Sequence, residues 1–199
     1  MKTAILACLL SSAAAFAPAQ KSAKTSALNA EMSKSIPFLT APKNTAGWVG
    51  DVGFDPLGFS DYFDMKWLRE SEIKHSRAAM LASLGFVVQQ FVTLPGMPDV
   101  DDSMLAPAAV GPSPMLQIFF GLGVLEFWSN NGKVTIENMF SDSSRVPGNF
   151  GFDPLGMAKG KSAEAMADME LKEIKNGRLA MCAIGGMMAH NIVTGEPLL

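Results

Sequence analysis

The chain has few of the residues on which most catalytic and metal sites depend. Its 199 residues include two cysteines, two histidines and one tyrosine. Cys8 lies in a segment that we expect to be removed, which would leave Cys182 alone and excludes a disulfide framework. We find no nucleophile–base pair, no glycine-rich phosphate loop followed by Lys and Ser or Thr, and no cysteine metal cluster. These absences predict that the protein is not an enzyme.

Charged residues are also scarce. They make up 18% of the chain, against 48% for apolar residues, whereas about 25% charged is usual for soluble domains. The net charge of -3 gives no sign of nucleic-acid binding. A chain of this length is sufficient for one domain. The composition therefore favours a single-domain membrane protein with no nucleic-acid partner.

The N-terminal part of the chain is typical of a targeting sequence. Residues 1–15 carry one basic residue, an apolar run and then small residues, which predicts a signal peptide too short to span a membrane. Residues 16–30 bear Ser and Lys without an acidic residue, as transit peptides do. The Ala-Phe-Ala-Pro junction resembles the presequence of diatoms and related algae with secondary plastids, which implies import into a chloroplast. A plain secreted protein is the alternative.

The mature part, residues 31–199, contains three helical stretches with apolar segments. We expect helices at 61–94, 114–131 and 162–194. A helix of roughly 20 residues spans a bilayer core. None of the three is an uninterrupted apolar stretch, so the charges inside them need partners. The sequence thus predicts an all-α membrane protein with three transmembrane helices.

The chain repeats itself. Residues 50–58 reappear as 148–156, and residues 72–80 reappear as 173–181. Both matches occur in the same order, which predicts that the first and third helices are structural copies. With one helix between them, both copies would enter the membrane from the same side. We therefore expect a crossed pair related by a pseudo-two-fold axis.

Charged residues recur at the start of both copies. Intramembrane charges cost several kcal/mol and are rarely unpaired. At about 100° per residue, Glu72 and Arg77 point roughly 140° apart, so they are poor partners within one helix. The repeat predicts two reciprocal pairs instead, Glu72 with Arg178 and Glu173 with Arg77. Such pairs could be purely structural.

The pairing also leaves ligand atoms. Each carboxylate would keep one spare oxygen, and His75 and Asn176 follow Glu72 and Glu173 by three residues. His190 lies on nearly the same face as Asn176, about 21 Å further along. Mg²⁺ favours hard oxygen ligands, and imidazole nitrogen also serves as the axial ligand of a chlorophyll magnesium. The alternatives are a satisfied core histidine and an asparagine that joins helices.

Both copies resemble a known family. Glu-Ile-Lys-His-Ser-Arg-Ala-Ala-Met and Glu-Ile-Lys-Asn-Gly-Arg-Leu-Ala-Met, each preceded by a Phe-Asp-Pro-Leu-Gly loop, resemble the signature helices of the light-harvesting complex superfamily over residues 32–199. The resemblance implies that chlorophyll magnesium is ligated by Glu72, His75, Glu173, Asn176 and His190. It also implies that the ends of two carotenoids are seated by Phe54, Asp55, Pro56, Phe152, Asp153 and Pro154.

The middle helix matches the family less completely. Glu126 follows Gly123 in the family's Gly-x-x-Glu pattern and is a further ligand candidate. Green-lineage proteins carry an Arg three residues after that Glu, whereas this chain has Ser129, so the partner of the Glu126 charge is open. Gln117 faces the opposite side of the helix. It would serve another pigment, or it is only a polar residue at a helix start.

The short linkers and the presequence resemble the fucoxanthin chlorophyll a/c and red-lineage antenna groups. The implied cofactors are chlorophyll a, chlorophyll c and a carotenoid such as fucoxanthin or diadinoxanthin; a cryptophyte antenna with alloxanthin stays open. The implied location is the thylakoid membrane of a secondary plastid, as a multi-pass protein among thylakoid lipids. The implied partners are other antenna subunits and a photosystem core, photosystem I in preference to photosystem II.

The implied function is to hold chlorophylls close enough for excitation to pass between them and on to a photosystem. One alternative is a photoprotective member of the same superfamily, in which Asp99, Asp101 and Asp102 sense lumenal pH, although a solvated loop also explains them. The other is a small membrane transporter or assembly factor whose buried charges line a pathway.

Overall fold

The computed structural model describes residues 31–141, 145–154 and 156–197. The predicted signal peptide, 1–15, and transit segment, 16–30, lie outside the described residues. The regular structure of the described part is helical, apart from one isolated bridge between Met32 and Thr40. The helices are α2 (Phe59–Tyr62), α3 (Met65–Val88), α4 (Ala106–Val110), α5 (Pro112–Ser129) and α6 (Ala163–Thr194). The all-α prediction is therefore confirmed for this part of the chain.

The predicted first helix, 61–94, is wrong at both ends. Asp64 is extended and caps α3, because its side chain accepts a hydrogen bond from the amide of Lys66 at 2.9 Å; this cap separates α2 from α3. The helix ends at Val88, where the side chain of Gln89 donates to the carbonyl of Val100 at 2.7 Å. These contacts with the following loop replace the continuation to residue 94.

The other two helices match their predictions more closely. The structure has α5 at 112–129 instead of 114–131, because Pro112 occupies its first turn, where a missing amide is tolerated. Helix α6 begins one residue after the predicted 162, because Ser162 is its N-cap and accepts from the amide of Ala165. The short helix α4 was not predicted.

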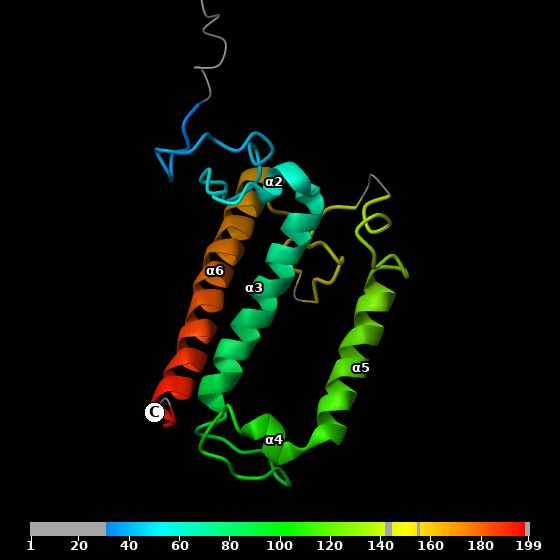
Figure 1. Cartoon of the computed structure of the whole chain (residues 1–199). Coiled ribbons are helices and arrows are strands. Elements are labelled where there is room, and N and C mark those ends of the chain that lie inside the picture. Colours follow the sequence, from blue (N-terminus) through cyan, green and yellow to red (C-terminus); the bar gives the residue numbers. More distant parts are fainter. Residues whose placement is uncertain (1–30, 142–144, 155, 198–199) are drawn as a thin grey trace, which may run out of the picture.

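Helices α3 and α6 lie side by side, and α5 stands apart from them (Figure 1). The chain descends through α3, returns through α5 and descends again through α6, so the two repeat copies run in the same direction. This is the relation that the repeat predicts for helices separated by one other helix.

Helices α3 and α6 are in tight contact where Ser76 faces Gly177. A Cβ atom on Gly177 would lie 2.2 Å from the Cβ of Ser76, so only glycine fits there. Ser76 is buried, with 1% of its surface exposed. Because these residues occupy the same position in the two copies of the repeat, an approximate two-fold axis passes through their contact.

Much of the apolar surface is exposed. The buried apolar side chains of the described residues are Ile73, Ala79, Met139 and Ile174. On α5, Phe119 and Trp128 are 70% and 76% exposed. Exposed apolar surface of this extent indicates contact with a ligand, a lipid or another protein. Within the described ranges, no helix combines the length and the apolar character needed to cross a membrane.

Candidate functional site

Two reciprocal ion pairs join α3 and α6. Nε of Arg77 lies 2.7 Å from Oε1 of Glu173, and Nε of Arg178 lies 2.8 Å from Oε1 of Glu72. These are the cross pairs that the repeat predicts. Each pair is half-buried, and because both partners are charged, each hydrogen bond is stronger than a neutral one.

Each arginine also fixes the loop that precedes the opposite helix. Nη1 of Arg77 donates to the carbonyl of Gly148 at 3.0 Å, and Nη1 of Arg178 donates to that of Gly50 at 3.0 Å. Both glycines have positive φ, 76° and 79°, which other residues rarely adopt. A Cβ on Gly148 would also lie 2.6 Å from Cδ1 of Ile73. The loops are therefore held against the crossing by the same contacts in both copies.

The Asp of each Phe-Asp-Pro-Leu-Gly loop accepts hydrogen bonds from backbone amides that follow it in the chain. Asp55 accepts from the amides of Phe59 and Ser60 at 3.0 and 2.9 Å. Asp153 accepts from those of Met157 and Ala158 at 3.0 and 2.9 Å. Burial alone would raise the pKa of Asp55, but the hydrogen bonds from the hydroxyl and amide of Ser60 and from the following amides hold it below its ordinary value.

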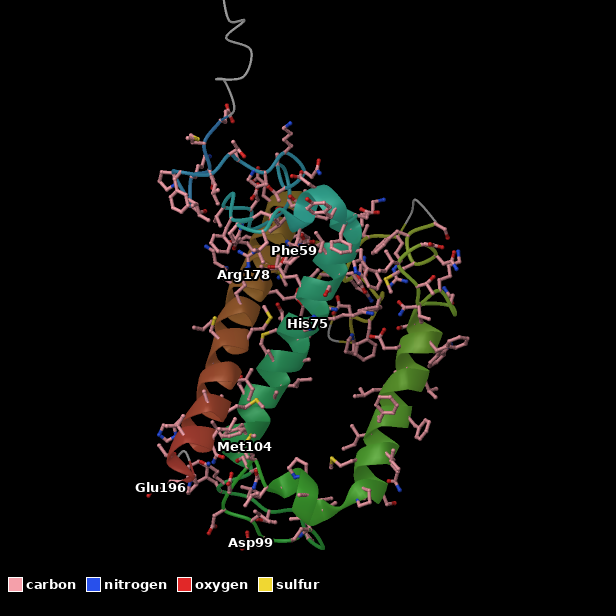
Figure 2. All side chains as sticks on the ribbon, viewed as in Figure 1. Phe59, His75, Asp99, Met104, Arg178 and Glu196 are labelled. Carbon is pink, nitrogen blue, oxygen red and sulfur yellow. The ribbon has the colours of Figure 1, made fainter. Side chains whose placement is uncertain are left out.

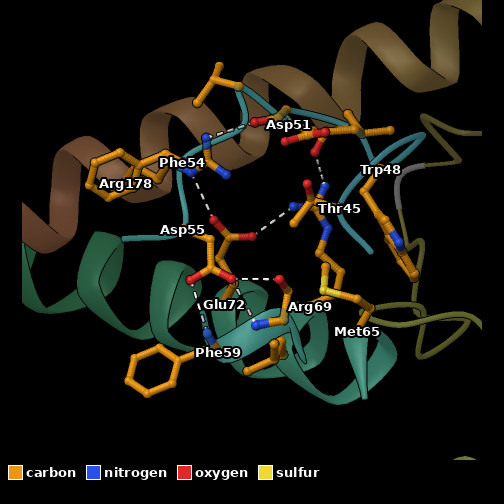
Figure 3. Close-up of a pocket in the computed structure, with 15 residues that line it drawn as sticks. Thr45, Trp48, Asp51, Phe54, Asp55, Phe59, Met65, Arg69, Glu72 and Arg178 are labelled. Carbon is orange, nitrogen blue, oxygen red and sulfur yellow. Dashed lines mark hydrogen bonds and ion pairs between the residues drawn. The ribbon is translucent and has the colours of Figure 1, made fainter. Parts of the chain in front are cut away.

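The loops form two cavities at equivalent positions of the repeat. The first, of about 460 Å³, lies between the loop that holds Phe54 and Asp55 and the side chains of Arg69, Glu72 and Arg178 (Figure 3). The second, of about 770 Å³, is lined by residues that include Phe152, Asp153, Arg77 and Glu173. The prolines of both loops, Pro56 and Pro154, are not among the lining residues. Two of the three predicted residues in each loop thus reach a cavity.

The two repeated carboxylates are not equivalent, which corrects the prediction of a spare oxygen on each. Oε2 of Glu72 accepts from Nη1 of Arg69 at 2.7 Å, and Nη2 of Arg69 also donates to the carbonyl of Val49. The residue of α6 at the position of Arg69 is Glu170. Each carboxylate oxygen of Glu72 therefore accepts from a guanidinium group, so a metal could bind only to a second lone pair of one of these oxygens. Glu173 pairs with Arg77 through Oε1.

His75 presents a nitrogen suited to a metal. Its Nδ1 lies 2.7 Å from the carbonyl oxygen of Ser71, one turn earlier in α3. Because a carbonyl only accepts, Nδ1 carries the proton, and in the neutral imidazole the lone pair belongs to Nε2. A histidine oriented by such a bond is typical of metal ligands. The ring is exposed on the middle of α3 (Figure 2).

The remaining predicted ligands lie on α5 and α6. Asn176 and His190 are exposed on α6, and Gln117 is exposed near the start of α5. Cys182 is also exposed and free. Glu126, near the end of α5, is half-exposed and forms an ion pair with Lys74 of α3, with Nζ 2.6 Å from Oε2. The structure therefore identifies the charge partner that the sequence leaves open.

A buried carboxylate next to this pair was not predicted. Glu70 is 2% exposed and accepts from the amide of Gly148. It lies 3.3 Å from Nη2 of Arg145 and 3.6 Å from Nζ of Lys74. Arg145 also donates to the side-chain oxygen of Asn130, just after α5. Glu70, Arg145 and Asn130 lie outside the repeat, and the charge of Glu70 within a helix was the available signal.

The donor set fits the magnesium of a chlorophyll. It consists of carboxylates compensated by Arg or Lys, an imidazole with an oriented lone pair, and amide side chains, all on surfaces where large apolar side chains are exposed. Hard oxygen donors suit Mg²⁺. Among the described residues, no group of three His, Cys, Asp or Glu could bind a bare metal ion. Single ligands, each for a pigment that supplies the other donors, agree with this arrangement.

The comparisons with known proteins identify the family. The profile of the family described as Chlorophyll A-B binding protein matches residues 41–192. The chain belongs to this family. It is a family of light-harvesting proteins, which are not enzymes, and the resemblance to the light-harvesting superfamily is thereby confirmed.

Relatives come from more than one branch. The light-harvesting complex stress-related protein 1, chloroplastic, of Chlamydomonas reinhardtii is 34% identical, over 80% of this chain and 65% of that protein. A chlorophyll a-b binding protein, chloroplastic, of Petunia hybrida is 32% identical, over 88% of this chain and 72% of its own length. A fucoxanthin-chlorophyll a-c binding protein, chloroplastic, of Isochrysis galbana is 36% identical, over 72% of this chain and 73% of its own length. The chain thus spans less than two thirds of the stress-related protein, and the similar identities do not select a branch.

Proposed function

We propose that this protein is a light-harvesting antenna that binds chlorophyll a, chlorophyll c and carotenoids and passes excitation energy to a photosystem. One observation carries the proposal: the repeated set of charge-compensated donors around the crossing of α3 and α6, next to exposed apolar surface. The pigments supply the absorption of light. The chain would position them, and none of its groups has to exchange a proton or an electron.

The proposed magnesium ligands are the charge-compensated carboxylates, the imidazoles and the amide of the two repeat helices and of α5. They are Glu72, His75, Glu126, Glu173, Asn176 and His190, with Gln117 as a further candidate. Arg77 and Arg178 would neutralise the carboxylates at the crossing, so that a neutral site faces each pigment. Without compensation, a carboxylate in an apolar environment is costly.

The two cavities are the proposed seats for carotenoid ends. In the first, Phe54 offers an apolar wall and Asp55 a hydrogen-bond acceptor, and Phe152 and Asp153 do so in the second. A carotenoid with oxygen-bearing end groups would need both kinds of contact. Pro56 and Pro154 would act by fixing the loops.

The proposed location is the thylakoid membrane of a secondary plastid, with α3, α5 and α6 as spanning helices. At about 1.5 Å per residue, the 24 residues of α3 extend roughly 36 Å, and a bilayer core is about 30 Å thick. The charged residues near the crossing would enter the membrane as neutral pairs. Other antenna subunits, thylakoid lipids and a photosystem core, photosystem I in preference to photosystem II, are the proposed partners.

The relatives support the pigment class. The Isochrysis galbana protein is named for fucoxanthin and chlorophylls a and c, which favours chlorophyll c with fucoxanthin or diadinoxanthin here. The stress-related relatives favour a second candidate, a photoprotective role. Two of the acidic residues considered for that role, Asp99 and Asp102, accept hydrogen bonds from Thr93 and Asn191 at 2.9 and 2.8 Å.

The test is the pigment content of the protein purified from its native membranes in mild detergent. Extraction should yield several chlorophylls and at least one carotenoid per chain, with chlorophyll c among them. A folded but colourless protein would exclude the proposal and favour the transporter or assembly-factor alternative. Bound pigment with a strongly shortened fluorescence lifetime would favour the photoprotective role.

A further inference from the structure

Glu126 of α5 has an unusual set of partners. Its Oε2 lies 2.6 Å from Nζ of Lys74 and 3.0 Å from Nδ2 of Asn130. Ser129, at the position where green-lineage relatives have an Arg, donates its hydroxyl to the backbone carbonyl of Glu126 and not to the carboxylate. The positive charge beside Glu126 therefore comes from the neighbouring helix α3, and both donors bind the same oxygen.

The side chain of Lys74 is itself held in place. It is 25% exposed, and its Nζ lies 3.6 Å from Oε1 of the buried Glu70. It also lies over the ring of Phe150, 5.8 Å from the centroid, which is a cation–π contact. Glu70 is anchored in turn by Arg145 and by the amide of Gly148. A lysine with this many contacts has little freedom to leave Glu126.

We propose that Lys74 is the positioning residue for a chlorophyll ligand on α5. It neutralises Glu126 and, together with Asn130, occupies Oε2, which leaves Oε1 to coordinate the magnesium of a chlorophyll. This inference rests on the proposed pigment-binding function and adds a residue of α3 to a site whose ligand belongs to α5. A purely structural bridge is the alternative.

The internal repeat offers a matched control. Lys175 of α6 is the counterpart of Lys74 and is exposed. Helix α5 lies on the α3 side of the crossed pair (Figure 1). Substitution of Lys175 removes the same charge at the same repeat position, away from Glu126.

The experiment uses the chain reconstituted with chlorophyll a, chlorophyll c and a carotenoid. The variants are Glu126→Leu, Lys74→Gln, Lys74→Arg, Lys175→Gln and the double variant Lys74→Gln/Glu126→Gln. The readouts are chlorophylls per chain, the absorption difference spectrum and the thermal unfolding of the helices by far-ultraviolet circular dichroism.

We expect Lys74→Gln to lose one chlorophyll, with the same difference band as Glu126→Leu, and to unfold at a lower temperature than the unsubstituted protein. Lys74→Arg and Lys175→Gln should keep the pigment. The double variant should recover both the pigment and the unfolding midpoint, because two neutral amides need no compensation and the Gln oxygen still ligates.

Several results would overturn the inference. Full pigment content in Lys74→Gln would show that Glu126 does not need this lysine. Loss of several pigments together, without recovery in the double variant, would assign Lys74 a structural role alone. If Glu126→Leu lost no chlorophyll from an otherwise pigmented protein, the ligand on α5 would be rejected while the antenna function stood. An unsubstituted chain that bound no chlorophyll would reject both.

Discussion

Ser76 on α3 lies directly against Gly177 on α6, and the two residues occupy the same position of the internal repeat. The approximate two-fold axis thus passes between a residue and its own counterpart. One side chain fits at this point and a second does not. The hydroxyl of Ser76 is buried without a hydrogen-bond partner in the described part of the chain.

Substitution at this contact should show that only one Cβ fits. Gly177→Ala would place a Cβ 2.2 Å from that of Ser76, and overpacking of this kind costs typically 1–3 kcal/mol. The double variant Ser76→Gly/Gly177→Ser moves the serine side chain from α3 to α6, so only one Cβ lies at the contact, and it should avoid most of the loss of stability. Thermal unfolding of the pigmented protein measures both effects. Equal midpoints for Gly177→Ala and the unsubstituted protein would contradict the close contact.

The cross pair of Arg77 and Glu173 should behave as one unit. Arg77→Met leaves a half-buried carboxylate uncompensated and should destabilise the protein, and Glu173→Gln should leave the arginine unpaired. The double variant should lose less stability than the sum of the losses in the single variants. The coupling free energy is about 0.5–3 kcal/mol for residues in direct contact. A double-variant cycle on the free energy of unfolding measures it. Additive losses would mean that the pair contributes little.

The repeat predicts which residue can replace His75. His75→Leu removes the nitrogen lone pair and should cost one chlorophyll per chain. His75→Asn places at this position the amide that α6 carries at Asn176, so it should retain the pigment with an altered absorption band. Chlorophyll stoichiometry and difference spectra distinguish the two. A full pigment complement in His75→Leu would remove His75 from the ligand set.

The loop of Asp55 should lose its support at acid pH. Because the pKa of Asp55 in the folded protein lies below its ordinary value of 3.8, its charge stabilises the fold above that pH, and the stabilisation is lost as the pH falls through the lower, folded value. Asp55→Ala should cost about 1 kcal/mol near neutral pH, as the loss of a helix cap does.

The pH dependence of that cost is the sharper check. The difference in unfolding free energy between Asp55→Ala and the unsubstituted protein should be constant from pH 7 to 5 and shrink below about pH 4. A difference that grew as the pH fell from 7 to 5 would mean that the pKa of Asp55 is raised instead.

The repeated part of the site was predictable because repetition places equivalent residues around one axis. The partners of Glu72 and Glu173 followed from helix geometry and from the cost of unpaired charges. The bond from Arg69 to Glu72 could not be predicted in this way, because the residue of α6 at the position of Arg69 is Glu170 and because Arg69 also donates to a loop carbonyl. Its effect on the ligand atoms of Glu72 therefore appeared only in the structure.

Contacts between distant, unrepeated segments could not be predicted. The pair of Lys74 and Glu126 depends on where α5 lies, which the pattern of α5 does not specify. The end of α3 at Val88 depends on bonds to the loop near Val100. A loop contact of this kind leaves no Gly or Pro signal at the helix end itself.

The fluorescence excitation spectrum of the protein purified from native membranes tests the central claim most directly. An antenna predicts that light absorbed by carotenoid and chlorophyll c drives emission from chlorophyll a, so their bands appear in the excitation spectrum with high yield. Excitation bands of chlorophyll a alone, from a protein that holds the other pigments, would contradict the antenna function.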